Sequence, residues 1–296
     1  MKYVFIVNPC AGEGGSEAKI REAIRNSKHE GECEVYLTKG PKDATSFVKN
    51  YPDEDVRFIA CGGDGTINEV VNGAVGRERT SVTCYPCGSG NDFVKVFGAD
   101  KFLDIEALLD AEAKPIDLIK VGDLYSDNVT NFGFDTTVAI TINKEREKTG
   151  HGSKSAYTKG IVTALIKSMK NTVTVTADGE VLNPSGKALL CTVANGMYVG
   201  GSFKCAPRAE IDDGWLEVCL IKPISRFRFV KILGPYTEGK HLDDESMKDI
   251  VVYKRAKKVE VKAAPGFAYS LDGEIIYSEN FTLEIAEKAL NFAVPG

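Results

Sequence analysis

The stretch of sequence that decides the fold is Val56-Arg57-Phe58-Ile59-Ala60-Cys61-Gly62-Gly63-Asp64-Gly65-Thr66. Its first six residues are mostly apolar, which is typical of a strand in a sheet that is covered on both faces. The glycines that follow indicate a tight turn, and residues 66–75 have the pattern of a helix. Further apolar strands are expected at 3–7, 33–37 and 82–86, with helices at 16–26 and 41–50. This alternation of strands and helices predicts a parallel α/β sheet.

Two other glycine-rich segments follow predicted strands. They are Asn8-Pro9-Cys10-Ala11-Gly12-Glu13-Gly14-Gly15 and Gly88-Ser89-Gly90-Asn91-Asp92. Open α/β sheets bind ligands at the carboxyl ends of their strands, so the three segments should converge on one crevice. Glycine lets the backbone approach a ligand closely, and the N–H groups that open a helix bind phosphate. The sequence therefore predicts a nucleotide site, although it contains neither G-x-x-x-x-G-K-[ST] nor a clean G-x-G-x-x-G.

The pattern changes after about residue 115. Short strands are expected at 117–121, 129–134, 172–176, 189–194, 216–221, 258–261 and 281–285, with helices at about 154–170 and 226–233. Turn pairs such as Asp178-Gly179 and Asp213-Gly214 join the strands, as in antiparallel hairpins. We therefore predict an α/β domain over 1–117 and a β-rich domain over 118–285. Whether the tail, 286–296, returns to the first domain is left open.

Composition restricts the function further. The chain has 296 residues, 43% of them hydrophobic, and a formal net charge of −5, which does not favour nucleic acid as a partner. The N-terminal apolar run stops at Val7, which is too short for the core of a signal peptide. No stretch approaches the roughly 18 apolar residues of a membrane helix. We expect a cytoplasmic protein whose membrane contact is peripheral.

The glycine-rich segments resemble those of a known family. Gly62–Thr66, followed by Asn68-Glu69, resembles the nucleotide loop of the diacylglycerol kinase catalytic family, whose superfamily includes NAD kinases and phosphofructokinases. N-P-x-x-G at 8–12, P-x-G-S-G-N-D-F at 86–93 and D-G-E at 272–274 are similar to other motifs of that family. The resemblance implies an NAD kinase/phosphofructokinase-like nucleotide domain and a β-sandwich domain that binds the acceptor. It also implies transfer of the γ-phosphoryl group from ATP to a lipid hydroxyl at the membrane surface, with diacylglycerol as the first candidate.

The same resemblance implies particular site residues. For the nucleotide they are Asn8, Pro9, Cys10, Ala11, Gly12, Thr38, Gly62, Gly63, Asp64, Gly65, Thr66, Ile67, Asn68 and Ser89. For the catalytic Mg²⁺ they are Asp64, Asp92 and Asp117, each of which could instead cap a helix or brace a loop. A second, structural Mg²⁺ would be bound by the Asp213 side chain with backbone oxygens of Glu210 and Trp215, where a plain turn is the alternative. Cys10 departs from the smaller or hydroxylated residue expected in the first loop.

Two D-G-E triplets compete for the role of proton acceptor. The residues around Asp178 alternate Thr and Val, as in an exposed hairpin, whereas Tyr269–Leu271 and Ile275–Tyr277 surround Asp272 with apolar groups. A carboxylate whose proton affinity must be tuned is better placed in the second setting. The residues therefore favour Asp272, and the resemblance implies it, with Glu274 in support. Catalysis would then take place between the two domains.

Two other functions remain open at this stage. An NAD kinase-like enzyme with a soluble acceptor would share the G-G-D-G-T segment, and a non-catalytic nucleotide-binding regulator would share the phosphate loops. Lys222–Lys231 mixes basic residues with Phe227 and Phe229, which suits either an anionic bilayer surface or a solvated helix. An exposed strand edge in the β-rich domain would allow a homodimer.

Overall fold

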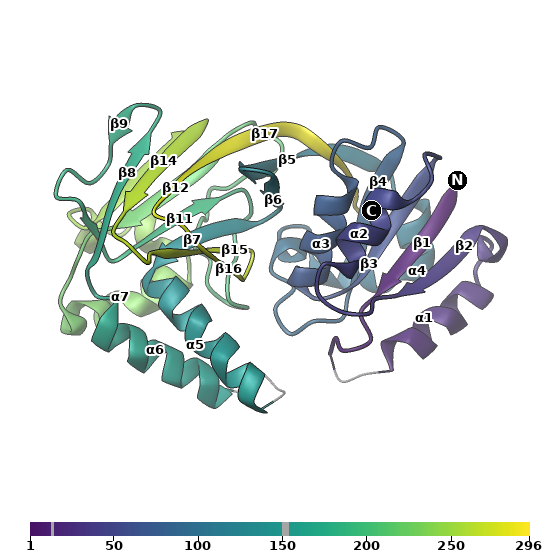
Figure 1. Ribbon diagram of the computed structural model, residues 1–296, viewed down its shortest axis with the longest axis horizontal. Helices are drawn as coiled ribbons and strands as arrows, with labels where there is room; N and C mark the ends of the chain where they lie inside the picture. The colour runs from purple at the N-terminus through teal and green to yellow at the C-terminus, as the bar shows by residue number, and fades with distance from the viewer. Residues whose placement is uncertain (13–14, 150–153) are drawn as a thin grey trace.

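The computed structural model describes residues 1–12, 15–149 and 154–296, which form two lobes joined by strands β5 and β17 (Figure 1). Residues 13 and 14 of the first glycine-rich segment lie outside the described residues. No helix in these ranges combines the length and the apolar character that a membrane span requires.

The first lobe contains a parallel sheet in the order β2-β1-β3-β4. Its strands are β1 (Lys2–Val7), β2 (Cys33–Leu37), β3 (Val56–Gly62) and β4 (Thr80–Pro86). Every residue of β3 is buried, as its apolar sequence predicts. All four strands end at the same edge, so the glycine-rich segments that follow β1, β3 and β4 lie together.

Helices cover both faces of this sheet. They are α1 (Ser16–Arg25), α2 (Asp43–Asn50), α3 (Asp64–Ala74) and α4 (Ile105–Asp110). The chain moves outward from β1 to β2 and then returns past β1 to β3 and β4. Right-handed crossovers therefore place α1 on one face and α2 and α3 on the other. Accordingly, α2 packs against α3 and α1 against α4. Short 3-10 helices lie at Glu30–Glu32, Phe93–Val96 and Ala99–Leu103.

The second lobe is a sandwich of two antiparallel layers. One sheet has the order β13-β12-β11-β7-β15-β16, and the other has the order β10-β8-β14-β17 with β5, β6 and β9 attached. The strands of the first are β7 (Val129–Gly133), β11 (Leu190–Ala194), β12 (Leu216–Ile221), β13 (Val251–Ala256), β15 (Ala268–Leu271) and β16 (Glu274–Tyr277). Those of the second are β5 (Ala113–Val121), β6 (Leu124–Ser126), β8 (Asn171–Ala177), β9 (Glu180–Val181), β10 (Lys187–Ala188), β14 (Lys258–Ala263) and β17 (Asn280–Ala293). Phe132, Val175 and Val218 belong to the apolar cluster between them.

The long strand β17 connects the two lobes. It pairs with β14 and β5 in the sandwich, and its Phe292 then pairs with Val82 of β4 in the parallel direction. The register against β5 shifts between Ala286 and Leu290, and Lys288 has a φ of 51°. The end of the chain therefore extends the sheet of the first lobe.

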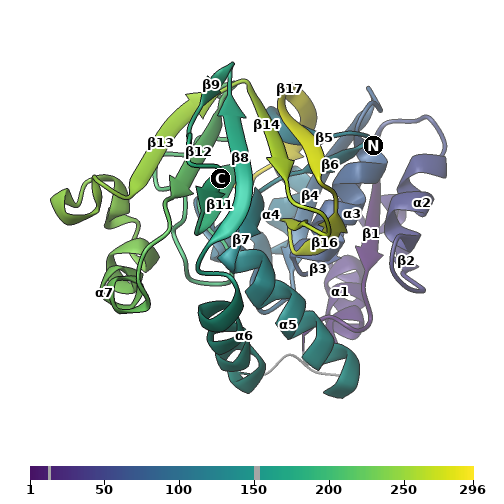
Figure 2. The same cartoon turned by 60° about the vertical axis from the view of Figure 1, so that its left-hand side comes forward.

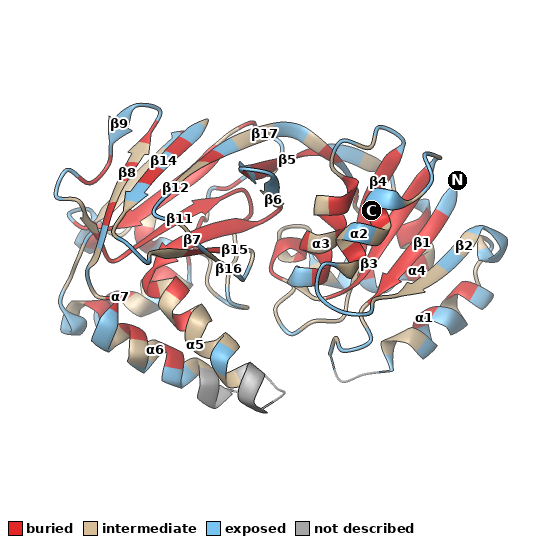
Figure 3. Cartoon of the chain, in the orientation of Figure 1, coloured by how far each residue is buried: buried red, intermediate tan, exposed pale blue. Residues whose placement is uncertain are grey.

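Three helices cover the outer face of the six-stranded sheet: α5 (Phe134–Thr149), α6 (Lys154–Lys167) and α7 (Arg226–Thr237) (Figure 2). Short 3-10 helices at Lys240–Leu242 and Glu245–Met247 follow α7. Helix α5 was not predicted, because the expected strand ended at residue 134 and no element was expected between 135 and 153. The chain instead turns at Gly133, whose φ is 98°. Burial is concentrated in the strands and on the inner helix faces (Figure 3), and the predicted fold class, an α/β region with a β-rich sandwich, is confirmed.

Candidate active site

Hydrogen bonds join the three glycine-rich segments at the edge of the first sheet. Asn8 Nδ2 donates to Thr66 Oγ1 at 3.3 Å, which links the first segment to the second. The backbone N–H of Cys87 donates to the Gly62 carbonyl at 2.8 Å, and that of Asp92 donates to Asp64 Oδ1 at 2.6 Å. The predicted convergence of the three segments is therefore present.

Glycine is required where these segments touch. A Cβ on Gly88 would lie 2.5 Å from the Cα of Gly63, and a Cβ on Gly12 would lie 2.5 Å from the Cys87 carbonyl oxygen. Gly12 also has a φ of 65°, which few other residues adopt. Only residues without a side chain allow these loops to pack and still leave their N–H groups near a ligand.

The residues predicted to bind a nucleotide lie at or next to this edge, but their side chains differ in access. Pro9, Cys10, Gly12, Gly65 and Ser89 are exposed, and Asn8, Ala11, Thr38, Gly63 and Asp64 are half-buried. Gly62, Thr66, Ile67 and Asn68 are buried. The Ile67 side chain belongs to the core, so only its backbone is available to a ligand. Asn68 points away from the loops and contacts Asp272, as described below.

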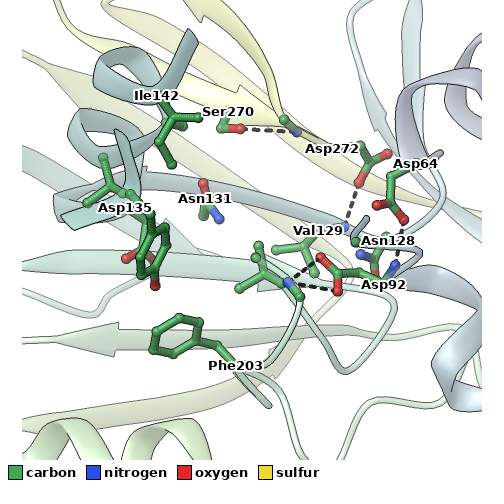
Figure 4. Close-up of a pocket in the computed structure, with 18 of the residues that line it drawn as sticks. Asp64, Asp92, Asn128, Val129, Asn131, Asp135, Ile142, Phe203, Ser270 and Asp272 are labelled. Atoms are coloured by element: carbon green, nitrogen blue, oxygen red, sulfur yellow. Dashed lines mark hydrogen bonds between the residues drawn. The ribbon is translucent and has the colours of Figure 1, made fainter. Parts of the chain in front are cut away.

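A cavity of about 490 Å³ extends from this edge into the second lobe (Figure 4). One end is polar and is lined by Asp64, Ser89 and Asp92 from the first lobe with Asp127, Asn128, Asp272 and Glu274 from the second. The other end is lined mainly by apolar side chains of α5, α6 and α7, among them Val138, Ile142, Ile161, Phe229 and Leu233. Carboxylates and an apolar chamber therefore share one cavity.

Asp272 occupies the turn between β15 and β16, with a φ of 46°. Its Oδ1 accepts hydrogen bonds from Ser126 Oγ at 2.7 Å and from the Val129 N–H at 2.8 Å. Its Oδ2 accepts from Asn68 Nδ2 at 2.8 Å and from the Asp127 N–H at 3.1 Å. Burial raises the pKa of Asp272, and these donors act in the opposite direction by stabilising the carboxylate. Asp178, in the other D-G-E triplet, lies in the β8–β9 hairpin on the surface.

Sequence reasoning missed Asp127, which lies beside Asp272. Asp127 is 2% exposed, and its Oδ1 has no hydrogen-bond partner among the described residues. Burial, together with the neighbouring Asp272 carboxylate, raises the pKa of Asp127 far above its ordinary value. The Asp127 carboxyl therefore binds a proton more tightly than an ordinary Asp side chain does. The only sequence signal was a charged residue two positions before the predicted strand 129–134.

Asp64 and Asp92 form a second carboxylate pair. Burial, and next the charge of Asp92, raise the pKa of Asp64 to about 6. Asp92 accepts hydrogen bonds from Lys95 Nζ at 2.6 Å and from the Gly201 N–H at 3.0 Å. Lys95 neutralises part of the charge of Asp92, but Asp92 still raises the pKa of the half-buried Asp64. A divalent cation would relieve that repulsion. The oxygen atoms of Asp64 and Asp92 therefore fit a Mg²⁺ site.

Asp117 is not brought to this cavity. Its Oδ2 accepts the Gly214 N–H at 2.6 Å and its Oδ1 accepts the Lys288 N–H at 2.7 Å, so the carboxylate braces a loop and the bulge of β17. It lies instead beside the 210–215 segment predicted to bind a second Mg²⁺. There Asp213 accepts the Trp215 N–H and forms an ion pair with Arg255. A cation at the Asp213 side chain would therefore have to displace the Arg255 guanidinium. The second Mg²⁺ site, with backbone oxygens of Glu210 and Trp215, stays a prediction.

Two of the polar side chains at the apolar end of the cavity contain an atom without a hydrogen-bond partner in the described chain. Asp135 begins helix α5 and faces the cavity, and burial raises its pKa to about 6. Within the described residues, neither Asp135 Oδ2 nor the Tyr236 hydroxyl has a hydrogen-bond partner. Unpaired buried polar groups are costly and need an explanation, such as water or a ligand group in the cavity.

Comparison with known proteins assigns the chain to a family. The family model described as "Diacylglycerol kinase catalytic domain" matches residues 2–121, and that described as "YegS C-terminal NAD kinase beta sandwich-like domain" matches residues 128–294. The chain belongs to the diacylglycerol kinase catalytic-domain family. Membership in this family makes it a kinase, and its curated relatives include proteins named as diacylglycerol kinases and as probable lipid kinases.

Individual relatives agree with this assignment. A protein of Bacillus subtilis named "Diacylglycerol kinase" is 28% identical over 91% of this chain and 88% of its own. One of Pseudomonas aeruginosa named "Probable lipid kinase YegS-like" is 28% identical over 96% of this chain and 92% of its own. The crystal structure of a diacylglycerol kinase from Bacillus anthracis superimposes with a TM-score of 0.71 at 20% identity, covering 99% of this chain and 96% of that one. That structure shares the fold.

Proposed function

We propose that this chain transfers the γ-phosphoryl group of ATP to a hydroxyl group of a lipid, with diacylglycerol as the first candidate acceptor. The observation that carries the proposal is the single cavity in which Asp64, Asp92 and Asp272 meet an apolar chamber. A phosphoryl donor needs the polar end, and an acceptor with hydrocarbon chains needs the apolar end. A soluble acceptor such as NAD would gain nothing from a chamber lined by Phe229, Leu233 and Ile161.

The glycine-rich segments would bind the phosphates of ATP. Their N–H groups lie at the edge of the sheet, and α3 begins at Asp64, within the second segment. Bound Mg²⁺, held near Asp64 and Asp92, would neutralise charge on the phosphates. The raised pKa of Asp64, about 6, is consistent with a carboxylate placed for a cation. In this proposal the roles of Asp117, Asp213 and Glu210 are structural.

Asp272 would accept the proton of the lipid hydroxyl. As the hydroxyl oxygen attacks the γ-phosphorus, the bond to the ADP oxygen breaks and the hydroxyl proton moves to the Asp272 carboxylate. All four lone pairs of Asp272 are engaged in hydrogen bonds, so one donor must release an oxygen first. The Ser126 hydroxyl, at 2.7 Å, is the donor whose hydrogen can rotate away without moving any heavy atom. Asp127 stays protonated and stabilises the ionised form of its neighbour.

The acceptor would lie with its hydroxyl near Asp272 and its hydrocarbon between the helices. The cavity volume of about 490 Å³ falls within the roughly 300–1,000 Å³ of typical small-molecule sites. Burying a methylene group in such a chamber contributes about 0.8 kcal/mol, so chain length should govern acceptor affinity. Glu274 lies at the rim and is exposed, which suits a role in orienting polar groups rather than in proton transfer.

Labelled Mg-ATP with a panel of acceptors tests this proposal. The panel contains diacylglycerol, ceramide and a long-chain alcohol in mixed micelles, with NAD and glycerol as soluble acceptors. We expect label in a lipid product and none in NADP or glycerol phosphate. Label in NADP alone would replace the proposal with a soluble-acceptor kinase, and ATP binding without transfer to any acceptor would favour a regulator.

A further inference from the structure

Helices α6 and α7 present an unusual outer surface. Four of the nine large apolar side chains that are strongly exposed in the described chain lie on these two short helices: Val162, Ile166, Phe227 and Val230, at 50%, 66%, 73% and 66% exposure. Val162 and Ile166 are one turn apart, and so are Phe227 and Val230. Each pair therefore forms an apolar face that points away from the protein.

The charges around these side chains have one sign. Residues 157–171 and 222–237 contain no Asp or Glu, although the whole chain has a net charge of −5. Their basic residues are Lys159, Lys167, Lys170, Lys222, Arg226, Arg228 and Lys231. Acids from neighbouring elements neutralise two of them, because Glu145 pairs with Lys159 and Asp249 pairs with Arg228. Among the described residues, Lys167, Lys170, Arg226 and Lys231 form no ion pair.

The two helices form one continuous surface. Arg226 Nε, at the start of α7, donates to the Leu165 carbonyl near the end of α6 at 2.7 Å. Lys231 Nζ lies 4.5 Å from the centre of the Phe227 ring, so a basic and an aromatic group stand side by side. Ile166 and Lys167 occupy the last turn of α6, close to this contact. We call the surface formed by Val162, Ile166, Lys167, Lys170, Arg226, Phe227, Val230 and Lys231 the α6–α7 face.

The opposite sides of the same helices line the cavity that reaches Asp272. Ile161 of α6 and Phe229 and Leu233 of α7 belong to its apolar end. Two of the four exposed residues are adjacent in sequence to a residue that lines the chamber: Val162 follows Ile161, and Val230 follows Phe229. The helices separate the chamber from the outside by one helix thickness.

We propose that the α6–α7 face docks on an anionic lipid bilayer, with its apolar side chains inserted at the boundary of the headgroups and its cations against the anionic lipids. An amphipathic surface with basic residues beside Phe, Ile and Val is the kind that binds such a boundary. Docked in this way, the protein places the wall of its chamber against the source of its lipid acceptor. This inference rests on the proposed function only in taking the acceptor to be a membrane lipid.

Charge favours a bilayer over a second copy of the chain. A two-fold dimer through this face would place the same basic residues opposite one another, because such an interface is self-complementary. Like charges would then face each other with no acid within 157–171 or 222–237 to compensate. An anionic lipid surface has the complementary sign.

Vesicle flotation tests the proposal. Wild type is compared on vesicles of phosphatidylcholine alone and of phosphatidylcholine with phosphatidylserine, at low and high salt. Two double variants are used, Phe227→Ser with Val230→Ser and Lys167→Glu with Lys231→Glu. The matched control is Val181→Ser with Lys262→Glu, which changes an exposed apolar and an exposed basic residue on the β8–β14 sheet.

We expect wild type and control to bind the anionic vesicles, with weaker binding at high salt. Each α6–α7 variant should bind at least tenfold more weakly, since each cation at an anionic surface contributes about a fivefold factor. Wild-type binding to anionic vesicles that survives in both variants would overturn the proposal. So would self-association of wild type through this face, lost in the variants, without vesicle binding.

Activity separates this inference from the proposed function. The variants should lose transfer to diacylglycerol presented in vesicles and keep transfer to a short-chain diacylglycerol dissolved as a monomer, because none of the changed side chains lines the cavity. Loss of both activities with intact vesicle binding would overturn the assigned role of the face. Vesicle binding with no transfer by wild type to either acceptor would retain the docking surface and reject the lipid kinase.

Discussion

The side-chain amide of Asn68 donates a 2.8 Å hydrogen bond to Oδ2 of Asp272, a residue 204 positions further along the chain. Asn68 belongs to α3, which begins at the second glycine-rich segment, and Asp272 belongs to a hairpin of the sandwich. The same amide also donates to the Tyr125 carbonyl at 2.9 Å. The nucleotide loop and the proposed proton acceptor are therefore positioned by one shared side chain.

Replacing Asn68 tests whether this contact serves catalysis. In Asn68→Ala, Asp272 loses a hydrogen bond to its charged form, worth about 1.5–3 kcal/mol, so its pKa should rise. At pH values below the raised pKa, kcat should fall roughly ten- to a hundredfold, because less of the carboxylate is ionised. The KM for ATP should change little. Asn50→Ala is the control, because the Asn50 side chain is exposed and donates to the Ser46 carbonyl within α2, far from Asp272 in the fold. A raised KM for ATP with an unchanged kcat would instead support the nucleotide contact that the sequence predicted for Asn68.

Removing Asp127 should move the pH profile. Protonated Asp127 helps to stabilise the ionised form of Asp272, so Asp127→Ala should raise the pKa of Asp272. A proton acceptor must be ionised, and the acid limb of kcat should therefore shift to higher pH. Steady-state kinetics between acidic and neutral pH measure the shift, with Asp123→Ala, on the exposed turn before β6, as the control. An unchanged limb would show that Asp127 does not act through Asp272.

Asp135 should make stability depend on pH. Its pKa rises from 3.8 to about 6 in the folded protein, so the folded state binds the proton more tightly than the unfolded state does. The cost is absent below pH 3.8, grows as pH rises and is complete above about pH 6. Relative to wild type, Asp135→Asn should gain about 3 kcal/mol of unfolding free energy between these limits. Urea unfolding of both proteins at acidic and neutral pH measures it, and a constant difference would contradict the assignment.

Alanine substitutions at two glycines distinguish the role of glycine in loop packing from its role in letting a ligand approach the backbone. Gly88→Ala forces a Cβ to within 2.5 Å of the Gly63 Cα, so it should lower both thermal stability and ATP affinity. Gly65→Ala meets nothing within 4 Å and lies in α3, where alanine is favoured, so the fold should be unharmed or slightly stabilised. If phosphate approaches the backbone there, ATP affinity alone should fall. Calorimetry of ATP binding beside thermal unfolding checks both, and an undisturbed Gly88→Ala protein would argue against the described packing.

The local sequence was sufficient to predict the fold of the first lobe and part of the candidate site. The strand ahead of Gly62 is wholly buried, and the three glycine-rich segments meet because parallel strands end at one edge. The preference for Asp272 over Asp178 came from apolar neighbours, and the structure places Asp272 in the cavity and Asp178 on the surface. In each case the deciding contacts lie within a few residues or follow from a repeated βα unit.

The remainder depends on contacts between distant segments, which a pattern does not reveal. Asp127 becomes informative only when the β15–β16 hairpin places Asp272 beside it. Asp117 lies in a strand that was expected to border the crevice. Its carboxylate instead accepts a hydrogen bond from the backbone N–H of Lys288, 171 positions later, in the bulge of β17. Helix α5 was hidden because Thr136, Thr137 and Val138 favour strands locally, and packing against the six-stranded sheet overrides that preference.

The most direct test compares Asp272→Asn with Asp178→Asn in phosphoryl transfer from labelled Mg-ATP to a lipid acceptor in mixed micelles. The two residues share the D-G-E triplet and a φ of 46°, which asparagine tolerates, so the substitutions are matched in backbone and chemistry. We predict that Asp272→Asn loses about 10²–10⁴-fold in kcat while binding ATP normally, and that Asp178→Asn retains wild-type activity. Equal activity in wild type and Asp272→Asn would contradict the account, because the proton would then leave by another route.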